Sequence, residues 1–187
     1  MQIGSADPDG AETAAQRIAD RGGAGASEYA EAVYPELKEI WAEMGEREAA
    51  PVLAYVPPVP ISTRPLVPAV AYVQARRCTE EERTLDAVVD MASHPVPHRH
   101  GEPEITRLEL PAGLACRVHE VLLSEADEDG RSFLSERVDH YVLPPQCPEG
   151  MFKLSVQWAG PTISVAMVEI ADRMGVSLGV WAEGEGE

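Results

Sequence analysis

The chain lacks asparagine altogether and has only two lysines, Lys38 and Lys153, whereas alanine, glutamate, arginine, valine and glycine are abundant. This bias is typical of a protein encoded by a GC-rich bacterial genome. No apolar run is long enough to span a bilayer, and the first thirty residues hold no stretch that resembles a signal peptide. The sequence therefore predicts a cytoplasmic protein that does not insert into membranes.

The motifs that mark common enzyme families are missing as well. The chain has no glycine-rich phosphate loop, no G-x-S-x-G turn and no H-E-x-x-H helix. The cysteines are odd in number, and Cys78, Cys116 and Cys147 lack the spacing of a disulfide framework, so we expect reduced thiols. The sequence thus predicts a protein that is not an enzyme and carries no cofactor.

Positive charge is scarce, because 15 lysines and arginines stand against 32 aspartates and glutamates, which gives a formal net charge of -17. Such a surface repels phosphate backbones and anionic lipids and attracts basic protein surfaces. We therefore expect no nucleic-acid binding and a protein partner with a basic surface. Plain solubility is the alternative explanation of an acidic surface, and the sequence leaves both open.

The clearest pattern in the chain is a series of β-strands. In Met151–Trp158, apolar side chains alternate with more polar ones, which is the period of a strand with one face in a core and the other in water. Leu114–Leu123 and Phe133–Leu143 precede it as strands, separated by an acidic turn with the hairpin signal Asp129-Gly130. A further strand is predicted near Glu104–Leu110.

Two helices accompany these strands in the sequence. Thr79 and Glu82 form a capping box that predicts a helix from about Glu80 to Ala92. Thr162 is predicted to cap a second helix, with Gly175 as its stop or with a continuation of the pattern through Leu178 as the alternative. The apolar face expected for that helix comprises Ile163, Met167, Ile170 and Met174.

The N-terminal third is less regular. Residues 1–26 are predicted to be a flexible tail, in which a short helix over Ala11–Arg21 would bury little because its apolar face is mostly alanine. A helix of about Pro35–Glu48 follows, with the proline in its first turn. Val52–Val56 is then predicted as an edge strand at the start of a proline-dense segment, and Ala69–Arg76 as the next strand.

Together these elements predict an α+β fold, with a mostly antiparallel sheet that ends in a C-terminal meander and is flanked by helices. We expect a flexible tail (1–26), an N-terminal helix (27–50), an α+β domain (51–182) and an acidic tail (183–187). A chain of 187 residues is long enough to bury a substantial core.

One cluster of residues has the chemistry of metal ligands. His94, His98 and His100 lie close in the sequence, and imidazole nitrogens bind zinc or nickel well. Pro95 and Pro97 stiffen the backbone between them, however, and no cysteine or carboxylate completes a known ligand spacing. These histidines are therefore weak metal candidates, and an exposed loop that joins a helix to a strand is the simpler interpretation.

A cysteine nucleophile is the other catalytic possibility, because Cys116 and His119 lie on one predicted strand. Residues three apart on a strand point to opposite faces, so this pair does not form a nucleophile and its base. Cys116 shares its face with Leu114, Val118 and Leu122, which favours the role of a small buried apolar residue.

Candidate partner-binding residues lie in the N-terminal part of the chain. Leu37, Trp41 and Met44 form an apolar stripe on the predicted N-terminal helix, and Ile61 lies among prolines. Tryptophan is enriched at interaction hot spots, so this stripe is the best candidate for an interface, with core packing as the alternative. Trp158 is in line with core-facing residues of its strand, which predicts a place in the core.

The closing part of the chain shows a strand, a proline turn, a strand, a small-residue cap and a helix: Val138-Asp139-His140-Tyr141-Val142-Leu143-Pro144, Phe152–Trp158, Gly160-Pro161-Thr162 and Glu169-Ile170-Ala171-Asp172. Over Val52–Val180, this succession resembles an actinobacterial branch of the PsbP-like fold, which Ran-release factors and small mycobacterial lipoproteins share. The Pro51–Pro68 segment and the Pro35–Glu48 helix depart from the usual start of that domain. The resemblance implies an antiparallel sheet flanked by helices, used mainly as a protein-binding scaffold, for example by adaptor-chaperones of secreted bacterial effectors. It supplies no catalytic residues.

The sequence as a whole favours a non-catalytic protein-binding module, such as an adaptor, a chaperone or an immunity-type protein. One alternative is a small metal-binding protein or enzyme that uses the three loop histidines together with His140. Another is a structural subunit of a larger assembly, with the N-terminal tail as its contact arm.

Overall fold

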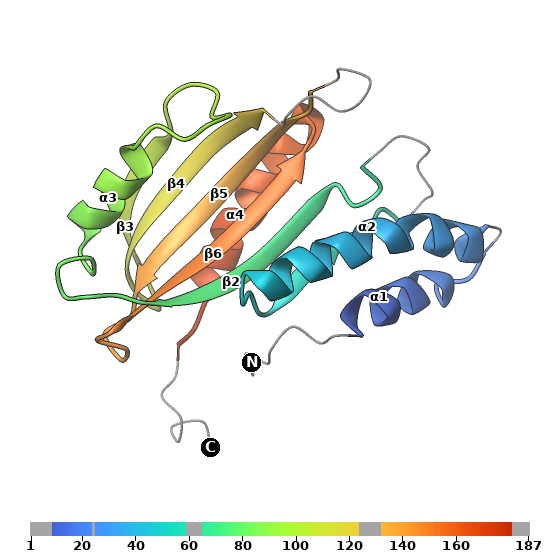
Figure 1. Ribbon diagram of the computed structural model, residues 1–187, viewed down its shortest axis with the longest axis horizontal. Helices are drawn as coiled ribbons and strands as arrows, with labels where there is room; N and C mark the ends of the chain where they lie inside the picture. Colours follow the sequence, from blue (N-terminus) through green and yellow to red (C-terminus); the bar gives the residue numbers. More distant parts are fainter. Residues whose placement is uncertain (1–8, 24, 59–64, 124–131, 181–187) are drawn as a thin grey trace. The chain divides into compact units, whose positions relative to one another are not determined.

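In the computed structural model of the protein (Figure 1), the structure describes residues 9–23, 25–58, 65–123 and 132–180. The chain divides into two compact units, unit 1 (Met1–Gln74) and unit 2 (Ala75–Glu187). Both units combine helices with antiparallel strands. The predicted α+β class with a mostly antiparallel sheet is therefore confirmed.

Unit 1 consists of two helices and a strand pair. Its elements are α1 (Gly10–Ala19), α2 (Ala26–Glu46), β1 (Val52–Tyr55) and most of β2 (Ala69–Arg77). β1 and β2 pair antiparallel, with Tyr55 opposite Ala69. Along β1 the side chains alternate between half-buried and exposed, which is the pattern of a strand with one covered face. Both strands lie where the sequence predicts them.

Helix α1 packs against α2 and is not a loose part of a tail. Ala11 and Ile18 are buried in one cluster with Val33 and Leu37 of α2. The sequence predicts a short helix here but little burial, and the second part of that prediction is wrong. The alanines that offer little apolar area also let two helix backbones approach closely, so a single isoleucine is enough to anchor α1.

Helix α2 begins at Ala26, next to the start of the predicted N-terminal helix segment (27–50), but Pro35 lies inside the helix and not in its first turn as predicted. An internal proline lacks the N–H that would bond to the carbonyl one turn earlier. Tyr29, Ala30 and Val33 precede the proline and are buried, so packing of this earlier turn keeps the helix continuous despite the missing hydrogen bond.

Unit 2 holds the end of β2 and the most regular part of the fold. Its elements are α3 (Leu85–Ser93), β3 (Glu104–Leu110), β4 (Gly113–Leu123), β5 (Leu134–Leu143), β6 (Gly150–Ala159), a 3-10 turn (Pro161–Ile163) and α4 (Ser164–Ser177). Strands β3 to β6 form an antiparallel meander in which each strand pairs with the next. These four strands match the predicted ones to within one residue at each end.

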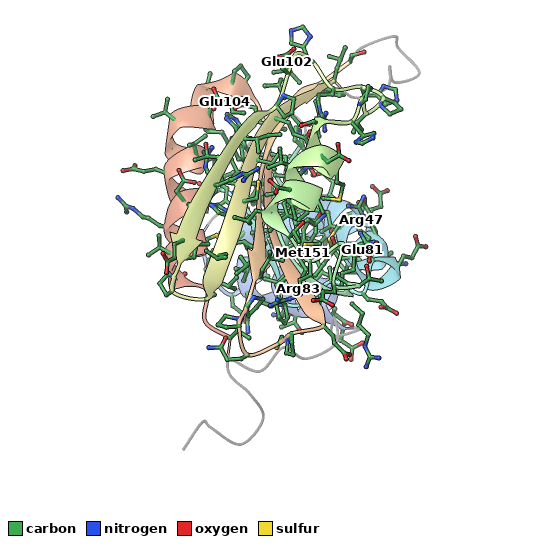
Figure 2. The ribbon with its side chains drawn as sticks, turned by 90° about the vertical axis from the view of Figure 1, so that its left-hand side faces the viewer. Arg47, Glu81, Arg83, Glu102, Glu104 and Met151 are labelled. Atoms are coloured by element: carbon green, nitrogen blue, oxygen red, sulfur yellow. The ribbon has the colours of Figure 1, made fainter. Side chains whose placement is uncertain are left out.

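The meander of unit 2 lies between two helices, with α3 on one face and α4 on the other (Figure 2). On the α3 face, Val88 packs in a cluster with Cys116 and Met151. On the opposite face, the backbone of α4 at Gly175 lies against the ring of His140. Both faces are therefore covered.

This double covering corrects the prediction for β6, in which Met151 and Ser155 face water. Met151 is 5% exposed and Ser155 is fully buried. Alternation along a strand tells which side chains share a face, but both faces of a strand are buried when helices cover the sheet on each side.

Helix α3 begins at Leu85, five residues after the predicted start. The expected capping box does form, since Thr79 and Glu82 exchange hydrogen bonds, but it closes only a turn. Thr84 is the actual N-cap, and its hydroxyl accepts a hydrogen bond from the Ala87 N–H. Arg83 lies between the box and this cap, and its side chain donates to the carbonyls of Gly150, at 3.1 Å, and Pro144.

Helix α4 presents a different face to the sheet from the one predicted. Its buried residues are Met167, Ala171 and Gly175, one turn apart, whereas Ile170 is 45% exposed. Thr162 does not cap the helix, which has no side-chain cap. At Gly175 the helix lies so close to the sheet that a Cβ atom would be 2.9 Å from the His140 ring, so this position leaves no room for a side chain.

In the ranges that the structure describes, no helix combines the length and the apolar character needed to cross a membrane.

Candidate functional site

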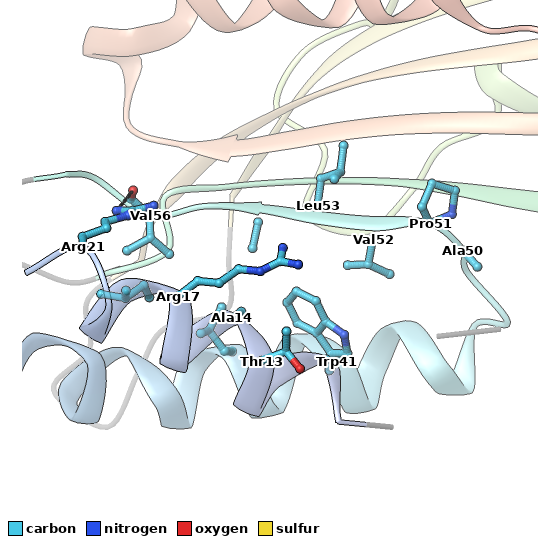
Figure 3. Close-up of a pocket in the computed structure, with 14 residues that line it drawn as sticks. Thr13, Ala14, Arg17, Arg21, Trp41, Ala50, Pro51, Val52, Leu53 and Val56 are labelled. Carbon is cyan, nitrogen blue, oxygen red and sulfur yellow. Dashed lines mark hydrogen bonds between the residues drawn. The ribbon is translucent and has the colours of Figure 1, made fainter. Parts of the chain in front are cut away.

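The first candidate site is a cavity of about 490 Å3 in unit 1, bounded by α1, by Trp41 of α2 and by residues 50–56, which include β1 (Figure 3). We call it the α1–β1 groove. Its volume lies in the range of about 300–1,000 Å3 that is usual for ligand sites. The side chains that matter for its chemistry are Thr13, Arg17, Arg21, Trp41 and Val52.

The fold of unit 1 creates this groove at the side of a strand. On one side β1 pairs with β2, and among the described residues of unit 1 it has no second strand partner. In an antiparallel pair, alternate residues direct both their N–H and C=O groups away from the partner strand. The edge of β1 therefore offers unpaired backbone donors and acceptors along the groove.

Glycine at position 10 allows Trp41 to contact α1. A Cβ atom at Gly10 would lie 1.9 Å from the Trp41 Nε1 atom, so any side chain there would displace the ring. The indole is half-buried, and the rest of its surface lines the groove. Trp41 is thus both a packing residue and part of the candidate site.

Two arginines give the α1–β1 groove a positive charge in a chain whose formal net charge is -17. Arg21 donates to the carbonyl of Val56 at 3.4 Å. Arg17 extends from α1 into the groove (Figure 3), and its guanidinium has no hydrogen bond or ion pair with any other residue that the structure describes. A guanidinium beside apolar walls is a good binding group for a carboxylate.

The second cluster of polar residues, in unit 2, links α4 to the sheet, and we call it the α4 anchor. The carboxylate of Glu136 accepts a hydrogen bond from the hydroxyl of Ser164, at 2.7 Å, and lies 3.0 Å from His119 Nε2. His119 also stacks on Trp158, with 6.1 Å between ring centroids. Because the carboxylate stands between hydroxyl and imidazole, Ser164 is not paired with the base that a serine nucleophile needs.

The α4 anchor includes a second group of charges. Asp172 accepts a hydrogen bond from Arg117 at 2.7 Å and lies 3.5 Å from His140 Nε2. His140 is 2% exposed, and this burial lowers its pKa, although the charge of Asp172 acts in the opposite direction. These contacts hold α4 on the sheet.

A third cluster lies on the α3 face of unit 2, and we call it the Glu120 cluster. The side chain of Glu120 is 3% exposed and accepts hydrogen bonds from Arg99 at 2.7 Å and from Arg137 at 3.0 Å. Arg137 also lies 3.3 Å from Asp139. Tyr141 donates to Asp139, and burial followed by the charge of that aspartate raises the pKa of Tyr141. Each buried charge in this cluster has a partner of opposite sign.

The Glu120 cluster was not predicted from the sequence, although the odd or even position of each residue along its strand indicates it. Glu120 has the same parity as Cys116 and Val118, which are predicted core residues, and Arg137 lies directly opposite it in the register of β4 and β5. A carboxylate on a core-facing position needs a cation, and the facing strand supplies one.

The three histidines proposed as weak metal ligands do not come together. His94, His98 and His100 are all exposed, and no group of three potential ligands occurs among the residues that the structure describes. The backbone of the loop bonds to β4 instead, through His100 N–H to Val121 and Leu123 N–H to His98. The loop thus serves to place Arg99 against Glu120.

The partner-binding candidates divide into three cases. Leu37 is fully buried and Met44 is 4% exposed within unit 1, so neither side chain is open to a partner. The sequence suggests that this stripe is exposed, but α1 and β2 cover it. Trp41 lines the α1–β1 groove. Ile61 lies outside the described residues.

The geometry of Cys116 and His119 agrees with strand parity. Cys116 is fully buried on the α3 face, while His119 belongs to the α4 anchor on the other face. Burial raises the pKa of the Cys116 thiol, which disfavours a reactive thiolate. All three cysteines are free, as predicted.

Arg17 and Arg21 are the site residues that sequence reasoning missed. They lie one helical turn apart in a segment predicted to be a tail, and they are two of only 15 positive residues in the chain. Two cations at i and i+4 on a short helix of a strongly acidic protein are the signal that identifies them.

No family model matches the chain, and no curated protein or solved structure is similar to it. The resemblance to the PsbP-like fold therefore stays a prediction.

Proposed function

We propose that this chain is a non-catalytic, cytoplasmic protein-binding module that holds its partner in the α1–β1 groove. The observation that carries the proposal is the combination of an open strand edge with the unpartnered guanidinium of Arg17 in one groove. Unpaired backbone groups and an unpaired charge are both stabilised when a partner supplies their counterparts.

The state of the other polar groups also supports binding over catalysis. Ser164, His119 and Glu136 are engaged with one another under α4, and the charges around Glu120 are paired and buried. Groups in these arrangements stabilise the fold, and none of them lines the α1–β1 groove.

The charge of the whole chain suits a role in recognition. A formal net charge of -17 attracts a basic partner over long range and repels nucleic acid. The resemblance to PsbP-like scaffolds, which mainly bind proteins, agrees with an adaptor, chaperone or immunity-type role.

Blocking the groove tests the proposal. Thr13 is exposed and lines the groove, whereas Ala42 is exposed on α2 and does not line it. We expect that proteins crosslinked to the wild-type chain in a lysate of the native host are retained by Ala42→Trp and lost with Thr13→Trp. Mass spectrometry of the three captures provides the measurement.

Both variants place the same large side chain on an exposed helical position. The effects of that side chain on folding and on non-specific binding are therefore matched between them. Captured proteins that do not distinguish Thr13→Trp from Ala42→Trp would contradict the proposal.

A further inference from the structure

We infer that the occupant of the α1–β1 groove is an extended segment of the partner protein that adds as a strand to β1 and places a carboxylate on Arg17. This inference rests on the proposed function and names the chemistry of the bound segment.

The backbone of β1 specifies an extended occupant. Val52–Tyr55 pair with β2 on one side only within unit 1, and the groove runs along the same residues. A helix laid in this groove would leave the outward N–H and C=O groups of β1 unpaired. An extended segment bonds to them directly, as in other cases of recognition by strand addition.

The two faces of β1 dictate an alternating pattern in the added strand. Val52 and Ala54 are half-buried on the face that bounds the groove, whereas Leu53 and Tyr55 are 56% and 52% exposed. Side chains of an added strand would alternate between the same two faces. Those on the side of Leu53 and Tyr55 would be apolar, because they would cover these exposed side chains.

On the groove side, the lining residues select a different chemistry. Arg17 provides a cation without a partner among the described residues, and Trp41 provides an aromatic surface. A segment that carries an acidic residue and an apolar residue two positions apart places one on each, since residues i and i+2 of a strand share a face. The expected segment is thus about four to six residues long, to match β1.

The local charge of the groove differs from the charge of the chain. The net charge of -17 favours a partner that is basic overall, whereas Arg17 and Arg21 favour an acidic group at the point of contact. Long-range attraction acts mainly on the rate of encounter, and a contact with a guanidinium acts on the lifetime of the complex. The two requirements are therefore compatible in one partner.

A selection of random linear peptides on the full chain tests the inference, with fluorescence anisotropy to measure the affinity of the selected peptides. We expect selected sequences to share an aspartate or glutamate, and Arg17→Gln to weaken binding by about tenfold, as expected for one hydrogen-bonded ion pair. The matched control is Lys38→Gln, which removes the same charge from an exposed position of α2 outside the groove lining and leaves binding unchanged.

Two further measurements separate charge from backbone recognition. Changing the shared acidic residue of the peptide to its amide should weaken binding to the wild-type chain by the same factor and have no added effect on Arg17→Gln. Alternate backbone nitrogens of the peptide can be methylated in two ways, at the odd or at the even positions. Only one of these two peptides should lose binding, because only alternate N–H groups of an added strand face β1. Arg17 is exposed, so Arg17→Gln should unfold at the same urea concentration as the wild type.

The outcomes distinguish this inference from the proposed function. Selected peptides whose binding is insensitive to both Arg17→Gln and N-methylation, or a selection that yields no peptide, would overturn the inference. The proposed function would still stand in either case if the crosslinked partners depend on Thr13, and it falls only if they do not.

Discussion

In unit 2, arginines that lie against the two faces of the sheet are paired with carboxylates, whereas in unit 1 the guanidinium of Arg17 extends into a groove without a partner among the described residues. Arg99 and Arg137 share Glu120, and Arg117 bonds to Asp172. These arginines of unit 2 connect elements of the fold. We propose that Arg17, which has no such partner, binds a ligand instead.

The contrast has a physical basis in burial. A charge that leaves water needs an opposite charge and hydrogen bonds nearby, so an arginine beneath a helix is stable only when paired. Arg17 is exposed and keeps its hydration until a partner replaces it. This difference explains why we assign structure to the polar clusters of unit 2 and recognition to the groove of unit 1.

The largest effect that tests this contrast should come from Glu120→Ala, which leaves Arg99 and Arg137 without their shared carboxylate. We expect the free energy of unfolding, measured with urea, to fall by about 3–5 kcal/mol, the usual result of breaking a buried ion pair. The matched control is Glu169→Ala, which breaks an exposed pair with Arg173 and should change stability by less than about 0.5 kcal/mol. Equal effects of the two substitutions would show that the Glu120 cluster is not structural.

A smaller effect should distinguish two helical glycines, one in each unit. A Cβ atom at Gly175 would lie 2.9 Å from the His140 ring, whereas a Cβ atom at Gly45 of α2 would have no neighbour within 4 Å. We expect Gly175→Ala to lower the free energy of unfolding by about 1–3 kcal/mol through overpacking. Gly45→Ala should raise it by up to about 1 kcal/mol through helix propensity. Stabilisation by both substitutions would contradict the close contact of α4 with the sheet.

The smallest effect should appear as a pH dependence of stability through His140. Burial lowers the pKa of His140 below its ordinary value of 6.5, so the unfolded chain takes up a proton at this site more readily than the folded one. The free energy of unfolding should therefore fall as the pH is lowered from about 6.5 toward the folded-state pKa. Urea unfolding between these limits should show a shallower pH dependence for His140→Gln than for the wild type.

Much of unit 2 was predictable because its strands carry strong local signals. Alternation in Met151–Trp158 places a strand whose register then follows from its hairpin with the preceding strand. The spacing of three residues along one strand was enough to predict that Cys116 and His119 lie on opposite faces of the sheet. The position of helix α3 was less predictable, since a capping box at Thr79 closes a turn as well as it starts a helix.

Most of the candidate site in unit 1 could not be predicted from local sequence patterns. Leu37 and Met44 have the same helical spacing whether a partner or α1 and β2 cover them, and only the fold shows that the protein covers them itself. Arg17 lies in a segment whose alanine-rich face carries little apolar signal, so its role depends on where α1 packs. Of the predicted candidates, Leu37 and Trp41 line the groove, and only Trp41 is partly exposed there.

The amino-acid sequence by itself determined the α+β class, the four strands of the meander and the excess of negative charge, because these depend on local periodicity and composition. Only the tertiary structure decided which apolar faces are covered, which charges are paired and that Arg17 stands in a groove beside a strand edge. Burial and pairing are properties of residues far apart in the chain, and no local pattern records which of them will meet.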